Sequence, residues 1–164
     1  MRNTSFAGFH CSLAQSLEVM GDWWSPLILR DLYLGLDRFD QLVTDLGISR
    51  NLLTNRLQTM VDGGLITRTP YQENPVRYQY GLTEAGRELL PILMALTAWG
   101  DRWVTPAGGP PIQFKHTTCG HQTTPTVACS ECGEPLDIEH VTPAPGPGGR
   151  TAPGTALIAT VMPR

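Results

Sequence analysis

Apolar residues recur at helical spacing through much of the first hundred residues, and the pattern is clearest at Leu53, Leu57 and Met60. These residues are four and three positions apart, so they predict a helix with one buried face. Ser49 is suited to cap the start of this helix, because a serine hydroxyl accepts hydrogen bonds from the first backbone N–H groups. The pair Gly63-Gly64 supplies the φ > 0 freedom that ends a helix.

The opposite face of the same predicted helix is polar and carries almost no acid. It consists of Arg50, Asn51, Thr54, Asn55 and Gln58. A solvent-exposed face usually mixes Glu and Lys, whereas Arg, Asn, Thr and Gln donate to phosphates and read base edges in the major groove. The face therefore favours a DNA recognition helix beginning at Ser49, and an ordinary amphipathic helix is the alternative.

The flanking patterns place this helix in a winged helix-turn-helix. Residues 38–46 (RFDQLVTDL) have helical periodicity, and Gly47-Ile48 leaves a helix-turn-helix spacing before Ser49. Residues 65–71 and 76–82 are rich in β-branched and aromatic side chains, so they predict a hairpin joined by residues 72–75. The hairpin loop and Arg77 are then expected to contact the DNA backbone.

Further helices are expected on both sides of this core. One is capped by Ser12 and ends near residue 20, and a second runs from about residue 25 to 34. An apolar group expected in the core consists of Trp23, Trp24, Leu27, Ile28, Leu29 and Leu32. A last helix, residues 83–104, has an apolar stripe longer than a small winged helix can cover, which predicts a homodimer. Pro91 within it predicts a kink or break near Leu90.

Several linked motifs run through residues 11–104 without an evident gap. They are Arg38-Phe39, Gly47-Ile48-Ser49, Leu65-Ile66-x-Arg68 and Leu82-Thr83-x-x-Gly86. In these motifs the chain resembles the HxlR family of bacterial transcription regulators. The resemblance implies a dimeric winged-helix protein that represses or activates transcription. Many members have a glycine-lysine-tryptophan run where this chain has Gly21-Asp22-Trp23-Trp24, so no role of that lysine carries over.

Cys11 lies where some HxlR members have a redox- or electrophile-sensing cysteine, and the resemblance implies the same role here. The preceding His10 and the start of a helix are both features that stabilise a thiolate. A buried, unreactive cysteine is the alternative.

The charges are unevenly distributed along a chain whose formal net charge is −3. Residues 1–46 carry three arginines against six acids, and residues 83–164 carry five bases against seven acids. Residues 47–82 are the one positive segment, with four arginines against two acids. A positive field at the predicted reading head steers DNA, while acidic flanks discourage indiscriminate binding.

Residues 112–142 hold a second concentration of chemistry. HTTCG at 116–120 and CSECG at 129–133 share one order: ligand, two residues, cysteine, glycine. This spacing predicts a structural zinc site with a ribbon-like fold, held by His116, Cys119, Cys129 and Cys132, with His121 as a rival ligand. The segment has few apolar residues, so its folding would depend on the metal. A redox dithiol or an empty site is the alternative.

Glycine and proline mark the boundaries, since 18 of the 31 fall in the last 60 residues. The predicted organisation is an N-terminal arm (1–10), a winged-helix domain (11–104), a linker (105–111), a zinc-ribbon-like module (112–142) and a disordered tail (143–164). No run of 18 apolar residues occurs, and the N-terminus lacks the hydrophobic core of a signal peptide. A cytoplasmic protein is therefore expected.

The sequence thus predicts a mainly α protein with a small β-hairpin wing, an α+β winged helix-turn-helix with a zinc-ribbon-like module. The expected function is a homodimeric, sequence-specific transcription regulator, a repressor or an activator, that binds a double-stranded DNA operator and responds to a redox or small-molecule effector. No catalytic motif and no membrane partner is expected. A protein-interaction adaptor is the main alternative, and a thiol-redox enzyme built on Cys129 and Cys132 is a weaker one.

Overall fold

The computed structural model describes residues 5–104 and 107–161, and the chain forms two units. The first unit contains the chain up to Gly86 together with the segment from Thr142 onward, and the second contains residues 87–141. Three pieces of the predicted organisation lie outside the described residues: positions 1–4 of the arm, 105–106 of the linker and 162–164 of the tail.

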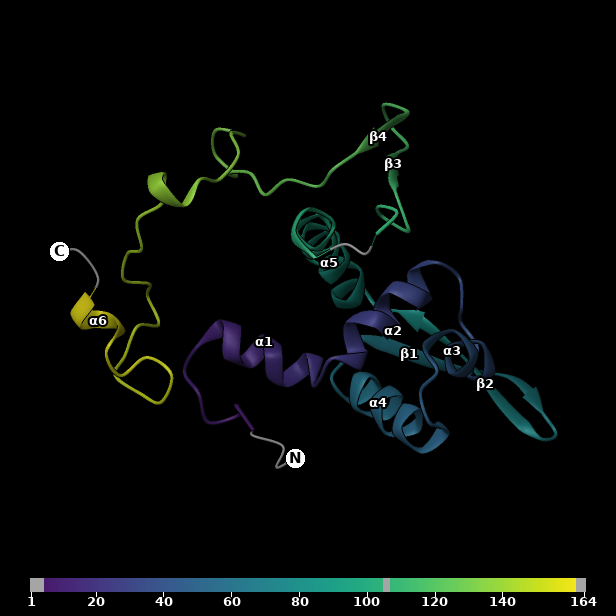
Figure 1. The fold of residues 1–164 in the computed structure, drawn as a ribbon. Coiled ribbons are helices and arrows are strands. Elements are labelled where there is room, and N and C mark those ends of the chain that lie inside the picture. Colours follow the sequence, from purple (N-terminus) through teal and green to yellow (C-terminus); the bar gives the residue numbers. More distant parts are fainter. Residues whose placement is uncertain (1–4, 105–106, 162–164) are drawn as a thin grey trace. The chain divides into compact units, whose positions relative to one another are not determined.

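The first unit has the element order of a winged helix (Figure 1). Its elements are α1 (Ser12–Met20), α2 (Trp24–Tyr33), α3 (Phe39–Leu46), α4 (Arg50–Asp62), β1 (Ile66–Glu73), β2 (Val76–Leu82) and, in the tail, α6 (Ile158–Val161). Helices α2 and α3 contact β2, and α4 contacts β1. The helices therefore pack against one small antiparallel hairpin, as the residue pattern predicts.

The core lies between these helices and the hairpin. The predicted stripe of α4 is confirmed, because Leu53, Leu57 and Met60 are at most 2% exposed. The other buried apolar side chains of the core are Ala14, Ile28, Leu29, Leu32, Leu42, Ile48, Leu65 and Ile66. Burying one such large side chain contributes about 1.5–3 kcal/mol, so this core fixes the orientation of α4.

Both ends of α4 are defined by local chemistry. Ser49 Oγ accepts a hydrogen bond from the Leu52 N–H at 3.3 Å, which confirms the predicted cap. Ahead of the cap, Gly47 has φ +62° and ends α3 in the left-handed conformation, where an L side chain would be strained. At the other end Gly64, with φ +72°, makes the turn into β1, whereas Gly63 keeps a negative φ.

An ion bridge fixes α3 against α2. The buried Asp31 accepts hydrogen bonds from Arg30 Nε at 2.8 Å and Nη2 at 2.6 Å, and the same Nη2 lies 3.2 Å from Asp45 Oδ2. Burial raises the pKa of Asp31 above its ordinary value, and the arginine opposes that shift. The bridge joins the C-terminal half of α2 to the last turn of α3.

The hairpin is longer than the sequence suggests. The strands pair from Ile66 opposite Leu82 to Glu73 opposite Val76, so only Asn74-Pro75 remains for the turn. The register shifts between Pro70 and Gln72, which leaves Tyr71 as an extra, unpaired residue in β1. The backbone just before α3 also joins this sheet, because Arg38 bridges Gln79 and the Tyr80 N–H donates to Asp37 O at 2.8 Å.

Two local predictions near α1 and α2 are wrong. Trp23 and Leu27 of the predicted core group are not in the core, because their side chains are 91% and 37% exposed. Trp23 precedes α2, which begins at Trp24, and Leu27 lies on the exposed side of that helix. Ser12 does not cap α1, because the helix begins one residue earlier than expected. The Gln15 N–H bonds to Cys11 O, which makes Cys11 the N-cap residue and leaves the start without a side-chain cap.

The second unit contains most of α5 (Glu84–Trp103), the hairpin strands β3 (Phe114–His116) and β4 (His121–Thr123), and a 3₁₀ turn, η1 (Ile138–His140). Helix α5 continues through Pro91, so the predicted break near Leu90 does not occur. None of the described residues of this unit is buried. It therefore lacks an apolar core within the part of the chain that the structure describes.

Candidate nucleic-acid interface and cysteine module

The outer face of α4 presents the predicted readers to solvent. Arg50, Asn51, Thr54, Asn55 and Gln58 are all exposed, and Ser49 stands at the N-cap. The first turn contains no acidic residue. Its N-terminus therefore keeps the positive end of the helix dipole open to an anion.

The five exposed side chains are engaged to different degrees. Asn51 and Asn55 make no side-chain hydrogen bond to another described residue, so both amides keep a donor and an acceptor for a base edge. Thr54 Oγ1 donates to Arg50 O at 2.9 Å. Gln58 donates to Asp62 Oδ1 at 2.7 Å and accepts from Arg68 Nη1 at 3.4 Å. The two asparagines are thus the most available readers.

Arg50 is turned toward α3. Its Nη2 lies 2.7 Å from Asp40 Oδ1, and its guanidinium stands 5.5 Å from the centre of the Phe39 ring. The Arg50 and Asp40 side chains are 66% and 64% exposed, so this ion pair contributes little to stability. Its effect is to direct Arg50 along the surface toward the start of α3.

Three arginines line a cavity of about 510 Å³ in the first unit. The cavity is lined by Arg38, Phe39, Asp40, Gln41, Arg50, Tyr71, Arg77, Tyr78 and Tyr80. The Arg38 guanidinium stacks 4.6 Å from the centre of the Tyr71 ring, and burial raises the pKa of the Tyr80 phenol, which keeps it neutral. Sequence reasoning named Arg50 and Arg77 but missed Arg38 and Tyr71. The Arg38-Phe39 motif was the signal for Arg38, and Tyr71 had none.

The other two arginines of the positive segment are held by the fold. Arg56 is largely buried, and its Nε lies 2.9 Å from Asp22 Oδ2, which ties α4 to the turn before α2. Arg68 stacks 4.6 Å from the centre of the Tyr78 ring, beside its contact with Gln58. Segment charge alone therefore overstates the number of arginines that point into solvent at the reading face.

Cys11 is half-buried at the N-cap of α1, and its thiol forms no disulfide. The preceding segment folds back on α1: Gln15 Nε2 donates to Phe9 O at 2.7 Å, and Glu18 accepts from the Phe6 N–H at 2.6 Å. The Phe6 and Ser5 donors lower the pKa of Glu18. The tail bonds next to the cysteine, since the His10 N–H donates to Pro153 O at 2.8 Å.

Residues 112–142, called the cysteine module below, contain the same turn twice. The Gly120 N–H bonds to His116 O at 2.8 Å, and the Gly133 N–H bonds to Cys129 O at 2.9 Å. The φ angles of these glycines are +76° and +77°, a backbone conformation that is strained for any residue with an L side chain. In each turn a ligand residue and a cysteine three positions later are brought to one side of the loop. The repeated sequence order therefore has a repeated backbone geometry.

Each turn brings two of the predicted ligands together, His116 with Cys119 and Cys129 with Cys132. His116 Nδ1 and Cys119 Sγ lie 3.4 Å apart, and the N–H groups of Cys132 and Glu131 lower the pKa of Cys129. His121 stands opposite His116 in the β3–β4 hairpin. Within the described ranges no three His, Cys, Asp or Glu side chains gather closely enough to share a metal ion. The structure thus forms each pair and does not bring the pairs together.

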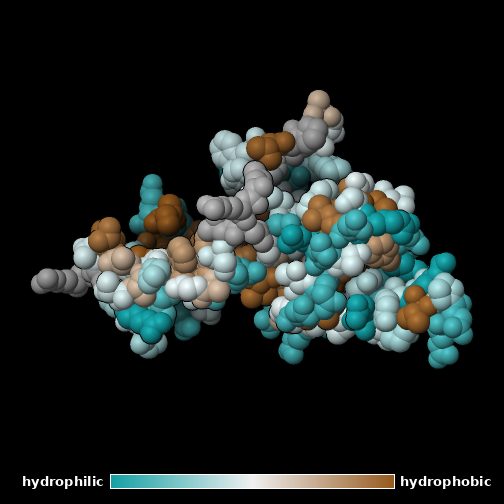
Figure 2. All heavy atoms as spheres, turned by 90° about the horizontal axis from the view of Figure 1, so that it is seen from below, coloured by the Kyte–Doolittle hydropathy of each residue, from teal (hydrophilic) through white to brown (hydrophobic). Residues whose placement is uncertain are grey.

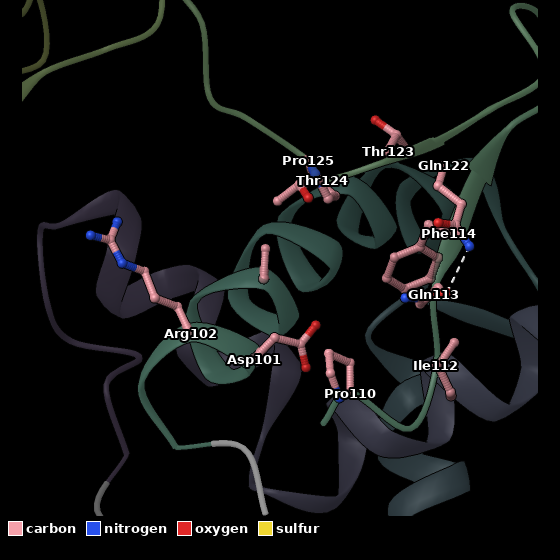
Figure 3. Close-up of a pocket in the computed structure, with 11 residues that line it drawn as sticks. Asp101, Arg102, Pro110, Ile112, Gln113, Phe114, Gln122, Thr123, Thr124 and Pro125 are labelled. Carbon is pink, nitrogen blue, oxygen red and sulfur yellow. Dashed lines mark hydrogen bonds between the residues drawn. The ribbon is translucent and has the colours of Figure 1, made fainter. Parts of the chain in front are cut away.

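A second cavity, of about 380 Å³, lies between the last turns of α5 and the β3–β4 hairpin (Figure 3). Phe114 from β3 and Asp101 from α5 point into the space between these elements, and Gln122 donates to Gln113 at 2.7 Å on its rim. The volume is in the range of small-molecule sites. Sequence reasoning gave no sign of this cavity, because its walls come from separate elements, α5 and the β3–β4 hairpin, which only the fold brings together.

The molecular surface shows no large uniform patch on the face drawn in Figure 2, where polar and apolar side chains are interspersed. Among the helices that the structure describes, none combines the length and the apolar character that a membrane crossing requires.

Comparisons with known proteins agree with this geometry. Residues 19–108 match the model of the HxlR-like helix-turn-helix family. An uncharacterized HTH-type transcriptional regulator of Mycobacterium tuberculosis is 44% identical over 137 residues, which cover 84% of this chain and 87% of the relative. A regulator of the same description from Synechocystis is 38% identical over 98 residues, or 59% of this chain and 73% of the relative.

Solved structures show the same relationship. The chain resembles the candidate transcription factor PA1607 with a TM-score of 0.74 and 32% identity, over 86% of this chain and 99% of that one. For a candidate transcription factor of Pseudomonas aeruginosa, PA1374, the TM-score is 0.59 and the sequence identity 39%, over 85% of this chain and 95% of that one. For the redox regulator HypR in its oxidized form, the TM-score is 0.53 and the sequence identity 28%, over 58% of this chain and 100% of that one.

Several of these matches extend past the winged helix, since a match of 137 residues is longer than the segment 19–108 that the family model covers. The family match spans more than half of the chain, and it contains the whole helix-turn-helix and hairpin described above. The protein is therefore a member of the HxlR-like helix-turn-helix family of transcriptional regulators.

Proposed function

We propose that this protein regulates transcription from the cytoplasm by binding a double-stranded DNA operator with α4 in the major groove. One observation carries the proposal: α4 is capped, packed on a buried core, and presents Asn51 and Asn55 without a side-chain hydrogen bond to any residue that the structure describes. Asparagine binds adenine through two hydrogen bonds in the major groove. An adaptor surface would instead show apolar residues on this face, so we favour DNA reading over protein docking.

The remaining exposed residues take supporting roles in this proposal. Ser49 and the N-terminus of α4 approach a phosphate, and Thr54 and Gln58 stand on the same face as the asparagines. Arg77 and the hairpin turn contact the DNA backbone. Sequence information would then come mainly from the asparagines, and position and orientation from the arginines and the helix end.

The test is to select the operator from a random DNA pool and then titrate variants against it. Asn55→Ala should lose about 1–3 kcal/mol of discrimination at one base pair and keep its affinity for random DNA. Thr59→Ala, one turn further along the same helix, is the matched control and should bind like the wild type. Unchanged operator preference in the Asn55→Ala variant would contradict the proposed reading face.

We propose further that the protein acts as a homodimer. Leu13 and Leu17 of α1 are exposed, as are Ile92, Leu96, Trp99 and Trp103 of α5. A twofold partner is the commonest way to cover such stripes. A dimer would also place two α4 helices on two half-sites of the operator, about one helical turn apart.

We propose that the cysteine module binds one structural zinc ion. The donor set of three cysteines and one histidine is one that zinc accepts, and each of the two turns already presents its pair of ligands. His116, Cys119, Cys129 and Cys132 would hold the ion, with His121 as the rival of His116. Binding requires the two pairs to approach each other, and the metal would supply the free energy for that step.

We propose that Cys11 responds to oxidants or electrophiles. A solved neighbour is described as a redox regulator, and the half-buried Cys11 stands at a helix N-terminus, where a thiolate is stabilised. Cys11 joins the arm to α1, and the two are also linked by the hydrogen bond from Gln15 to Phe9. Modification of the thiol would therefore alter the contact between the arm and α1. A small-molecule effector would occupy the cavity beside Phe114.

A further inference from the structure

Arg38, Arg50 and Arg77 come from three different elements and line one cavity. Arg38 precedes α3, Arg50 begins α4, and Arg77 lies in β2. Asp40 is the one acidic residue among those that line it, so the lining carries three positive charges against one negative. A cluster of guanidinium groups without matching acids is a site that an anion stabilises.

The backbone positions of these arginines are fixed by the fold. Arg38 bridges Gln79 of β2, and its N–H donates to Gln41 Oε1 at 3.0 Å. Arg77 stands in the ladder opposite Gln72. The cavity therefore depends on the contact between the start of α3 and the hairpin, and that contact exists before any ligand binds.

The side chains are arranged to donate. Arg38 lies against the Tyr71 ring, and it forms no ion pair within the described residues. A guanidinium stacked on a ring leaves the N–H groups in its plane available for an oxyanion. Arg77 likewise has no ion-pair partner among the described residues. Asp40, the one carboxylate in the lining, is paired with Arg50, so the guanidinium groups of Arg38 and Arg77 are not engaged by it.

Asp40 sets the position of the third guanidinium. Its contact of 2.7 Å with Arg50 Nη2, together with the Phe39 ring, draws Arg50 toward the cavity instead of along the outer face of α4. Arg50 would otherwise stand beside Asn51 and Thr54, where a guanidinium can reach a base edge. Asp40 is therefore a positioning residue for Arg50.

We propose that this cavity binds one phosphate group, held by Arg38 and Arg77 with Arg50 positioned by Asp40. The inference rests on the proposed function, since a backbone phosphate of the operator is the source that the site beside α4 favours. A free organic phosphate is the other source of the same chemistry. Held by Asp40 beside this phosphate, Arg50 is kept away from the outer face of α4, so the asparagines of α4 alone carry base preference.

The first experiment measures binding of operator and random duplexes over a series of salt concentrations. Arg38→Ala should weaken binding to both duplexes by a similar factor and lower the salt slope by about 1, because one phosphate contact is lost. Arg38→Gln, which keeps the packing of the side-chain stem, should do the same. Arg87→Ala removes an exposed arginine outside the cavity and is the control. If both Arg38 variants kept the wild-type salt slope, the phosphate in the cavity would not come from the DNA backbone.

The second experiment titrates inorganic phosphate and phenyl phosphate into the full-length protein and follows the Arg38, Arg50 and Arg77 resonances by NMR. Binding of either ligand that is lost in Arg38→Ala, beside unchanged DNA salt slopes, would assign the site to a free phosphate. No response in either experiment would overturn the phosphate site. Wild-type protein that binds no duplex would refute the proposed function, while this titration would still test the cavity.

A third measurement isolates the role of Asp40. Asp40→Asn should release Arg50, raise affinity for random DNA and lower the ratio of operator to random binding, whereas Asp40→Glu should restore most of that ratio. A residue that only stabilised the fold would change the unfolding midpoint and leave the ratio as it was. An unchanged ratio in Asp40→Asn would remove Asp40 from the DNA site.

Discussion

The winged helix and the cysteine module are held together by different physics. In the winged helix, Leu53, Leu57 and Met60 of α4 are buried with apolar residues of α2, α3 and the hairpin. In the module no described residue is buried, and its structure consists of a hairpin of two three-residue strands, two glycine-ended turns and the short η1. A fold that buries side chains is specified by periodicity, whereas a fold of turns is specified by a few local positions.

This difference has an energetic consequence. Fixing the backbone costs about 1–2 kcal/mol per residue, and the winged helix offsets that cost with a shared core. The module has no comparable burial, so it needs a stabiliser from outside its own side chains. Zinc binding to small cysteine and histidine sites is worth about 10–16 kcal/mol, which is why we expect the metal to decide whether the module is ordered.

The largest effect should come from removing zinc. Chelation should abolish order in residues 112–142 and leave the winged helix folded, because none of the proposed ligands precedes the linker. Cys132→Ala should lose stoichiometric zinc in native mass spectrometry, and His121→Ala should keep it if His116 is the fourth ligand. Ser130→Ala, in the same turn, is the control. A module that stays ordered by NMR without metal, in reducing buffer, would show that it needs no zinc.

A core substitution should produce the converse result. Leu57→Ala should lower the free energy of unfolding of the winged helix by about 2–5 kcal/mol, because it removes a buried side chain and leaves a cavity. Zinc stoichiometry should not change. Leu136→Ala, at a half-exposed position of the module, should change stability by less than about 0.5 kcal/mol. Urea titration followed by circular dichroism measures both, and equal losses would remove the distinction between the two regions.

The same contrast explains what could be predicted from sequence. The buried face of α4, its Ser49 cap and the hairpin follow from residues that are close along the chain, and the structure confirms them. The exposure of Trp23 was missed because its apolar character alone assigned it to the core, although it precedes both the predicted and the observed start of α2. A residue outside a helix belongs to no periodic face, so helical spacing does not predict whether it is buried.

The candidate site was predictable only where it is local. The exposed face of α4 follows from spacing within one helix. The cavity of Arg38, Arg50 and Arg77 depends on the extra residue at Tyr71 and on the bridge from Arg38 to Gln79, which join three elements. Likewise, spacing identifies each metal-ligand pair in the module, but it says nothing of the distance between the pairs. Tertiary register is the information that a single sequence does not display.

The smallest expected effect compares two side-chain caps. Ser49 Oγ accepts from the Leu52 N–H, and Asp137 accepts from the Glu139 N–H at 3.0 Å at the start of η1. Ser49→Ala should lower the free energy of unfolding by about 0.5–2 kcal/mol, because α4 unfolds together with the core that it packs against. Asp137→Ala should leave that value unchanged, since η1 has no buried residue that links it to a cooperative transition. Denaturant titration of both variants at one pH decides the comparison: a cap contributes to global stability only where the element it caps is packed, and a loss in Asp137→Ala comparable to that in Ser49→Ala would show that the module unfolds with the winged helix.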